Sequence, residues 1–173
     1  MKKSFIPDAF TFINLSCGIL SILSTINDKY VLASLLILLS GIVDRYDGRI
    51  ARFLKVSSDL GKELDSLADL VSFGVAPAIL SYVLFEFNKI GPYGVIGICL
   101  MLIFAICGAY RLARFNTVKF DGCFTGIPIT IAGCFVAVYD LINVYIRLPI
   151  ILSIVLLIIG AYLMISNIRL KKI

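Results

Sequence analysis

Long apolar stretches separated by short polar connections run the length of the chain. They cover about residues 9–26, 31–43, 60–85, 93–111, 127–143 and 150–165. A helix needs about 20 apolar residues to cross a hydrocarbon core of about 30 Å. The pattern therefore predicts an all-α integral membrane protein, with residues 1–173 forming a single transmembrane domain of six transmembrane helices.

Three of these stretches have a feature that needs a physical explanation. The second apolar stretch, 31–43, is too short to cross alone, so we expect its helix to continue through Asp44 to about Phe53. The first stretch contains Asn14, for which we favour a hydrogen bond to another helix over a ligand contact. Pro77 is expected to bend the outer half of the third helix.

Composition and charge agree with a membrane protein and give its orientation. Hydrophobic residues make up 60% of the chain, the mean hydropathy is +1.02 and the net charge is +5. With both termini inside, every lysine and arginine except Lys29, Lys89 and Arg147 falls on the cytoplasmic side. By the positive-inside rule, we expect a multi-pass protein of the cell membrane with both termini cytoplasmic. We expect no nucleic-acid partner.

The stretch 44–69 concentrates more than half of the chain's 11 acidic residues. Helical spacing places Asp44 and Asp47 on one face of one helix, and Asp65 and Asp69 on one face of the next. Four converging carboxylates repel one another unless cations lie among them. Because the ligands are all oxygen and the chain has no histidine, two Mg²⁺ or Mn²⁺ ions fit better than zinc. Paired divalent cations are typical of phosphoryl transfer, which would take place here at the cytoplasmic face.

The same stretch resembles a known family signature. Its fixed positions are Asp44-x2-Asp47-Gly48-x2-Ala51-Arg52-x8-Gly61-x3-Asp65-x3-Asp69. This is similar to the complete signature of the CDP-alcohol phosphotransferases, enzymes that bind a CDP-linked lipid or alcohol and let a hydroxyl acceptor attack its phosphorus, expelling CMP. The resemblance also favours a homodimer.

The resemblance implies a role for each signature residue. Asp44, Asp47, Asp65 and Asp69 would hold the two metal ions, and Asp69 would also be the catalytic general base. The CDP-lipid would be bound by Asp47, Gly48, Ala51, Arg52 and Gly61. Close packing of helices is the other interpretation of Gly48 and Gly61. The other interpretation of the aspartates is a network of ion pairs with Arg45, Arg49, Arg52 and Lys62.

Three further segments bear on the acceptor. YRLARFN at 110–116, FTGIP at 124–128 and the opening IPDAFTFINLSCG resemble segments of the phosphatidylserine synthases of this family. They imply L-serine as acceptor and either CDP-diacylglycerol or CDP-archaeol as donor, with Arg111, Arg114 and Asn116 as candidates for the serine carboxylate or a phosphate oxygen. By spacing alone, the two arginines would rather be a membrane-surface anchor.

Two alternatives remain from the sequence. A related enzyme could use glycerol 3-phosphate or an inositol phosphate, whose dianionic phosphate would need a denser set of cations from Arg111, Arg114 and Lys119. An ion-coupled transporter is the alternative from another class, because acids inside membranes mark ion pathways. The acidic residues cluster at one face, however. Asp140 is the one acidic residue in the last three apolar stretches, so no acidic relay crosses the membrane.

Overall fold

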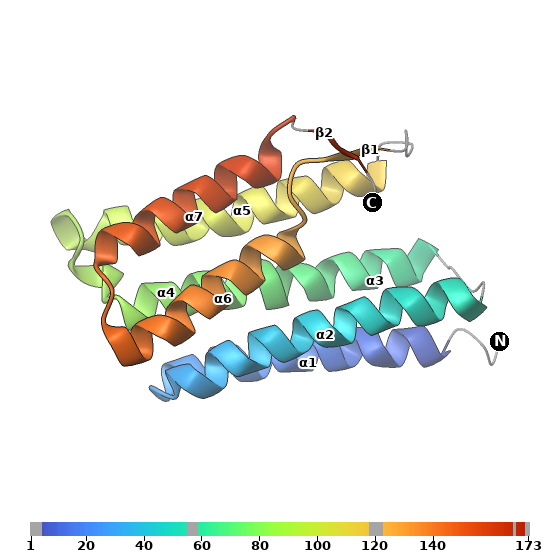
Figure 1. The fold of residues 1–173 in the computed structure, drawn as a ribbon, viewed down its shortest axis with the longest axis horizontal. Helices are drawn as coiled ribbons and strands as arrows, with labels where there is room; N and C mark the ends of the chain where they lie inside the picture. The colour runs from blue at the N-terminus through green and yellow to red at the C-terminus, as the bar shows by residue number, and fades with distance from the viewer. Residues whose placement is uncertain (1–4, 55–58, 118–122, 168, 172–173) are drawn as a thin grey trace.

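The protein is a bundle of helical rods along one axis, in which each rod runs antiparallel to the rod before it in the chain (Figure 1). This computed structural model describes residues 5–54, 59–117, 123–167 and 169–171, with side chains described over 9–46, 60–117 and 126–167. The helices are α1 (Phe5–Ile26), α2 (Tyr30–Leu54), α3 (Asp59–Asp69), the π-helix η1 (Leu70–Val75), α4 (Ala76–Leu84), the short 3-10 helices η2 (Phe87–Lys89) and η3 (Pro92–Gly94), α5 (Val95–Thr117), α6 (Ile129–Ile146) and α7 (Ile150–Ile165).

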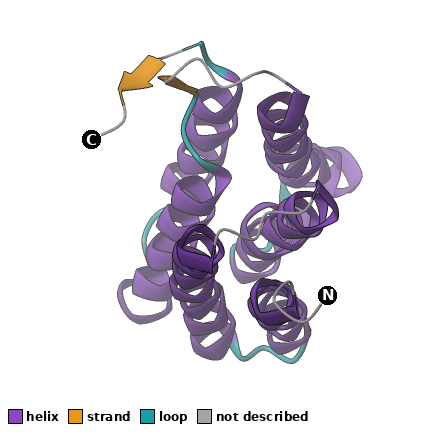
Figure 2. Cartoon of the chain, turned by 90° about the vertical axis from the view of Figure 1, so that its right-hand side faces the viewer, coloured by secondary structure: helices purple, strands orange, loops and turns teal. Residues whose placement is uncertain are grey.

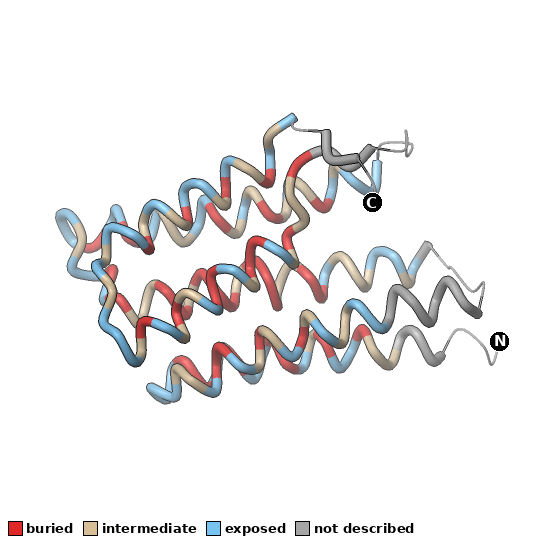
Figure 3. Tube along the Cα trace, viewed as in Figure 1, coloured by how far each residue is buried: buried red, intermediate tan, exposed pale blue. Residues whose placement is uncertain are grey.

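The rods pack as pairs around a shared centre. Helix α1 lies along α2 and α5 lies along α7, while α6 contacts α2 and α4 between the two pairs. Figure 2 views the bundle end-on, from the side where α1 begins and the two strands lie. Buried positions concentrate on η1, α4 and α6 (Figure 3). The centre of the bundle is therefore built around the segment that follows Asp69.

Within the described residues, four helical stretches are long and apolar enough to cross a membrane. They are Ala9–Ile26, Leu60–Leu84, Pro92–Thr117 and Ile129–Ile146. Large apolar side chains such as Phe12, Ile103 and Phe135 are exposed on the outside of the bundle, as lipid contact requires. These helices make the chain an integral membrane protein, and they confirm the helical architecture expected from the apolar pattern.

Helices α2 and α7, which were also expected to span, are not among these four stretches. The apolar part of α2 ends at Val43, where Asp44 and Arg45 follow within the helix. Helix α7 has only 16 residues, or about 24 Å at 1.5 Å per residue. Helix α2 does continue past Asp44 as predicted, ending at Leu54.

The third rod, which consists of α3, η1 and α4, changes its helical winding immediately after Asp69. Residues Leu70–Val75 form a π-helix, in which the Ala76 N–H donates to the Val71 carbonyl. Pro77 has no N–H to donate, so the carbonyl one turn before it has lost its usual helical partner. The bend expected at Pro77 is thus a wider turn just before the proline, and π-turns of this kind often occur at functional sites.

A two-stranded sheet, which the apolar pattern did not predict, joins two distant parts of the chain. Strand β1 (Cys123–Thr125) pairs antiparallel with β2 (Arg169–Lys171). Beside it, the Ile127 N–H donates to the Leu163 carbonyl at 3.1 Å. Gly126 has φ +77, and a Cβ there would lie 2.4 Å from the Met164 carbonyl oxygen. Residues 123–127, just before α6, are therefore fixed to the end of α7.

Candidate functional site

Three of the four predicted metal ligands come together in the structure. Asp44 on α2 and Asp65 and Asp69 on α3 each offer a carboxylate oxygen, and these three oxygens lie within 4.8 Å of one another. Asp44 and Asp65 are half-buried, whereas only 8% of Asp69 is exposed. The convergence predicted from helical spacing is therefore present for these three side chains.

The other signature residues of α2 are placed only by their backbone. Asp47, Gly48, Ala51 and Arg52 lie in the last three turns of α2, and their side chains fall outside the described residues. Gly61 lies half-buried on the first turns of α3. Both helices carry these residues at the same end of the bundle (Figure 1). This common position agrees with one pocket for a CDP-lipid at that end, which stays a prediction.

Asp69 is held by a neighbour from the first helix. The Asn14 side-chain amide, Nδ2, donates to Asp69 Oδ1 at 3.0 Å, and only 1% of Asn14 is exposed. Among the described residues, the charged groups that act on Asp69 are Asp44, Asp65 and Arg111. The interhelical hydrogen bond expected of Asn14 is confirmed, and its partner is the predicted general base.

Small residues let α1 and α6 approach the π-helix that follows Asp69. A Cβ on Gly18 would lie 2.5 Å from Ser72 Oγ, and one on Gly133 would lie 2.4 Å from the Phe73 carbonyl oxygen. Ser72 Oγ in turn donates to the Asn14 carbonyl at 2.9 Å. These contacts fix α1 against η1, so that Asn14 and Asp69 face each other.

Thr130, in the first turn of α6, lies next to the metal-ligand candidate Asp44. Its Oγ1 is 3.5 Å from Asp44 Oδ2, at the outer limit of a hydrogen bond. The spacing patterns in the sequence did not single out Thr130. Its position two residues after the FTGIP segment was the available signal.

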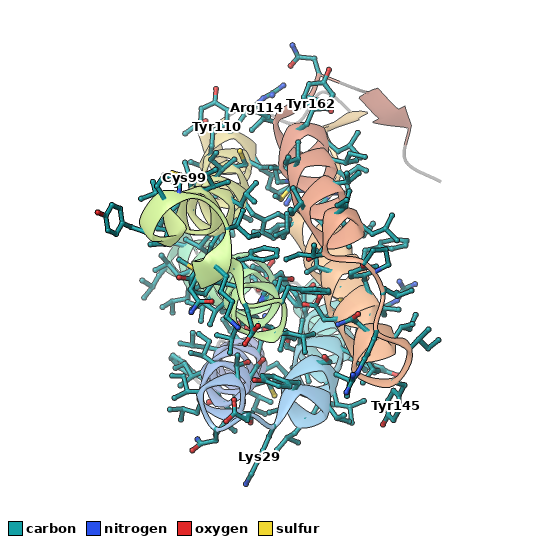
Figure 4. All side chains as sticks on the ribbon, turned by 90° about the vertical axis from the view of Figure 1, so that its left-hand side faces the viewer. Lys29, Cys99, Tyr110, Arg114, Tyr145 and Tyr162 are labelled. Carbon is teal, nitrogen blue, oxygen red and sulfur yellow. The ribbon has the colours of Figure 1, made fainter. Side chains whose placement is uncertain are left out.

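The three candidates for the acceptor pocket separate into two groups. Arg111 lies half-buried on α5, with its guanidinium 5.5 Å from the Phe115 ring centroid, and its charge acts on Asp69. Arg114 points instead to the end of α7, where it donates to the Asn167 Oδ1 at 2.9 Å and to the Ile165 carbonyl at 3.4 Å (Figure 4). Arg111 is thus the candidate beside the carboxylates.

Asn116 connects α5 to the helix that carries Asp65 and Asp69. Its side-chain amide donates to Ser66 Oγ at 3.0 Å and to Glu63 Oε1 at 3.3 Å. Arg114 and Asn116 therefore tie the end of α5 to α7 and to α3, one on each side.

The carboxylate cluster fits a hard divalent cation. Its donors are all oxygen, the ligand type that Mg²⁺ and Mn²⁺ prefer, and three carboxylates at this spacing carry mutual repulsion that a cation removes. Asp44, Asp65 and Asp69 could hold such an ion, and Asp47 is the fourth predicted ligand. The same set of oxygen donors suits Mg²⁺ and Mn²⁺ alike.

Comparison with known proteins identifies the family of this chain. A family model described as CDP-alcohol phosphatidyltransferase matches residues 4–170. The chain belongs to the CDP-alcohol phosphatidyltransferase family. The resemblance carried by the signature is thereby confirmed, and divalent cations are typical of this family.

Relatives within this family resemble the chain over most of its length. The chain is 39% identical over 172 residues to the CDP-diacylglycerol–serine O-phosphatidyltransferase of Bacillus subtilis, covering 96% of this chain and 89% of that protein. It is 43% identical over 169 residues to the protein of that name from Methanocaldococcus jannaschii, covering 96% and 74%. It is 35% identical over 171 residues to the archaetidylserine synthase of Methanothermobacter thermautotrophicus, covering 97% and 70%.

Other relatives are longer than this chain. The CDP-diacylglycerol–serine O-phosphatidyltransferase of Helicobacter pylori is 39% identical over 140 residues, which make up 79% of this chain but only 57% of that protein. The chain thus spans little more than half the length of this CDP-alcohol phosphatidyltransferase.

Proposed function

We propose that this protein transfers a phosphatidyl or archaetidyl group from a CDP-lipid to the hydroxyl of L-serine and releases CMP. The observation that carries the proposal is the cluster of Asp44, Asp65 and Asp69, whose carboxylate oxygens lie within 4.8 Å of one another. It occurs in a chain whose relatives, matched over 96% of its length, are named for serine transfer. The relatives are named for different lipids, so the proposal includes both diacylglycerol and archaeol as the lipid of the donor.

The reaction forms one bond and breaks another at the lipid-side phosphorus. The serine hydroxyl oxygen attacks that phosphorus, and the bond from it to the oxygen of the CMP phosphate breaks. Two divalent cations, when bound, supply positive charge for the attacking and leaving oxygens. In our proposal Asp44, Asp47, Asp65 and Asp69 hold them, while Gly48, Ala51, Arg52 and Gly61 contact the CDP-lipid together with Asp47.

Asp69 is the proposed general base that takes the serine hydroxyl proton. A base must lie within hydrogen-bond reach of the proton that it removes. Asn14 occupies Asp69 Oδ1, so we assign proton transfer to the other carboxylate oxygen. The hydrogen bond from Asn14 fixes the orientation of the carboxylate and therefore the direction in which that oxygen points.

Arg111 is the proposed partner of the serine carboxylate. It is half-buried, and its charge acts on Asp69, so an anion that it binds lies beside the reacting hydroxyl. A guanidinium can bind a carboxylate through two parallel hydrogen bonds. Because Arg114 and Asn116 already donate to other side chains, we assign them to positioning α5 rather than to direct contact.

The same observation weighs against a phosphorylated acceptor. A dianionic phosphate carries more negative charge than a carboxylate and would need a denser set of cations, yet the Arg114 guanidinium donates to Asn167 and Ile165 at the end of α7. Lys119, the third cation considered, lies outside the described residues. Serine, with a single carboxylate, fits one arginine better.

The wider setting of the site is part of the proposal. We place six helices across the membrane, counting α2 and α7, with both termini and the carboxylate cluster on the cytoplasmic side. The distribution of lysine and arginine supports this orientation. We also expect a homodimer, as the family resemblance favours.

The test is CMP release by purified protein in detergent. The donor is CDP-diacylglycerol or CDP-archaeol with Mn²⁺ or Mg²⁺, and the acceptors are L-serine, glycerol 3-phosphate, inositol phosphate and none. We expect release with serine alone, lost in Asp69→Asn and retained in Asp140→Asn, whose carboxyl is bonded to Ser81 farther along the third rod. Release with a phosphorylated acceptor instead would refute serine, and near-normal turnover by Asp69→Asn would refute the base.

A further inference from the structure

The side chain of Asn14 has two functional atoms, and only one of them has a partner. Nδ2 donates to Asp69 Oδ1 at 3.0 Å. The other atom, Oδ1, is fully buried and accepts no hydrogen bond from any described group. Buried acceptors without a partner are rare and costly, so this one calls for an explanation.

The orientation of the Asn14 amide is fixed by its partner. An ionised carboxylate only accepts hydrogen bonds, so the NH₂ group of Asn14 must face Asp69 and Oδ1 must face away from that bond. The backbone is fixed too, because Ser72 Oγ donates to the Asn14 carbonyl at 2.9 Å and Gly18 packs directly against Ser72. Asn14 therefore presents a preorganised acceptor next to the proposed base.

Serine also brings an ammonium group to the site, and no described charged residue has been assigned to bind it. Its ammonium carries three N–H donors and no acceptor. Arg111 has only donors, and the oxygens of Asp44 and Asp65 are the candidate metal ligands. Among the described side chains that bond to Asp69 or act on it by charge, Asn14 offers the one neutral acceptor.

We propose that Asn14 is a specificity-determining residue, whose Oδ1 accepts a hydrogen bond from the ammonium group of the amino-alcohol acceptor. The inference rests on the proposed function and deepens it. Nδ2 positions Asp69, while Oδ1 selects an acceptor with an amino group next to the hydroxyl. One side chain thus couples the choice of acceptor to the orientation of the base.

The experiment compares L-serine with 3-hydroxypropanoate, which has the same hydroxyl and carboxylate but no amine. For wild type and Asn14→Ala, kcat/KM is measured with each acceptor in the CMP-release assay. A hydrogen bond to a charged group is typically reflected in a change of about 10-fold to 100-fold. We expect the wild-type preference for serine to fall by at least about 10-fold in Asn14→Ala.

A positioning role alone gives a different result. If Asn14 only oriented Asp69, both acceptors would lose kcat equally and their ratio would stay unchanged, which would overturn the proposal. The control is Ser81→Ala, which also loses a buried interhelical hydrogen bond, to Asp140 Oδ2 at 2.8 Å, but should leave the ratio as it is in wild type.

A binding measurement keeps the test decisive if Asn14→Ala has no turnover. Binding of radiolabelled L-serine and 3-hydroxypropanoate is measured by equilibrium dialysis with Mn²⁺ and no CDP-lipid. Weaker binding of serine alone supports the proposal, and equal weakening of both or of neither overturns it. If wild type had no turnover with serine but used a phosphorylated acceptor, the proposed function would be refuted. That outcome is distinct from an unchanged preference in Asn14→Ala.

Discussion

Neutralising Asp69 should stabilise the metal-free protein and abolish its response to metal. At 4.8 Å, two carboxylates repel by about 3 kcal/mol at an effective dielectric constant of about 20. Asp69→Asn relieves its repulsion with Asp44 and with Asp65, about 6 kcal/mol in all. It also loses the attraction of Arg111 and weakens the hydrogen bond from Asn14, together about 4 kcal/mol. The net gain is about 2 kcal/mol.

The metal should stabilise wild type but not Asp69→Asn. At 100 times its dissociation constant, a ligand stabilises the folded state by about 2.7 kcal/mol. For a chain of 150–250 residues, each kcal/mol moves the midpoint by about 2–4 °C. We therefore expect Mn²⁺ to raise the wild-type midpoint by about 5–10 °C. Without metal, Asp69→Asn should melt about 4–8 °C above wild type, and Mn²⁺ should hardly move it.

The assay follows unfolding in detergent with a thiol-reactive fluorophore, whose signal rises as buried Cys17 becomes accessible. Asp140→Asn is the matched control, because Asp140 is a fully buried carboxyl bonded to Ser81, some 12 residues or about 18 Å along the third rod from Asp69. Its Mn²⁺ shift should equal that of wild type. If wild type did not respond to Mn²⁺, or if Asp69→Asn melted lower without metal and still responded, the repulsion argument would be refuted.

Two further changes test the packing around the site. Gly133→Ala should cost about 1–3 kcal/mol of stability and lower turnover, because its Cβ would lie 2.4 Å from the Phe73 carbonyl oxygen; an unchanged midpoint in the thiol assay would contradict this packing. Arg114→Ala should lower the midpoint by a few degrees through its lost bonds to Asn167 and Ile165 while leaving the KM for serine within about 3-fold; a KM raised 10-fold or more would return Arg114 to the acceptor pocket.

Local patterns in the sequence predicted the features of this protein that depend on local spacing. Apolar runs predicted the helices, and the i, i+4 spacing of Asp65 and Asp69 predicted their common face. The continuation of α2 past Asp44 followed from the length of its apolar part. The metal-ligand cluster was predictable because Asp44 lies about as far before the end of α2 as Asp69 lies after the start of α3.

Contacts between distant segments were not predictable in the same way. Arg114 and Asn116 looked alike in the sequence as polar residues at the end of one helix, yet one bonds to the end of α7 and the other to α3. The π-helix depends on a balance between Pro77 and the packing of α1 and α6 around it. The partner of Asn14 depends on which face of α1 meets α3, and the apolar pattern of α1 does not fix that face.

The pairing of β1 with β2 can form only late in the synthesis of the chain, because the two strands lie far apart in the sequence. Strand β1 emerges from the ribosome long before its partner, residues 169–171. A chain whose synthesis stops after α6 already contains every carboxylate of the metal-ligand cluster, but the Ile127 N–H has no Leu163 carbonyl to bond and Arg114 has no Ile165 or Asn167. Copies that stop there thus differ from copies that include α7 and β2 in the hydrogen bonds of Arg114 and Ile127, before any substrate is bound.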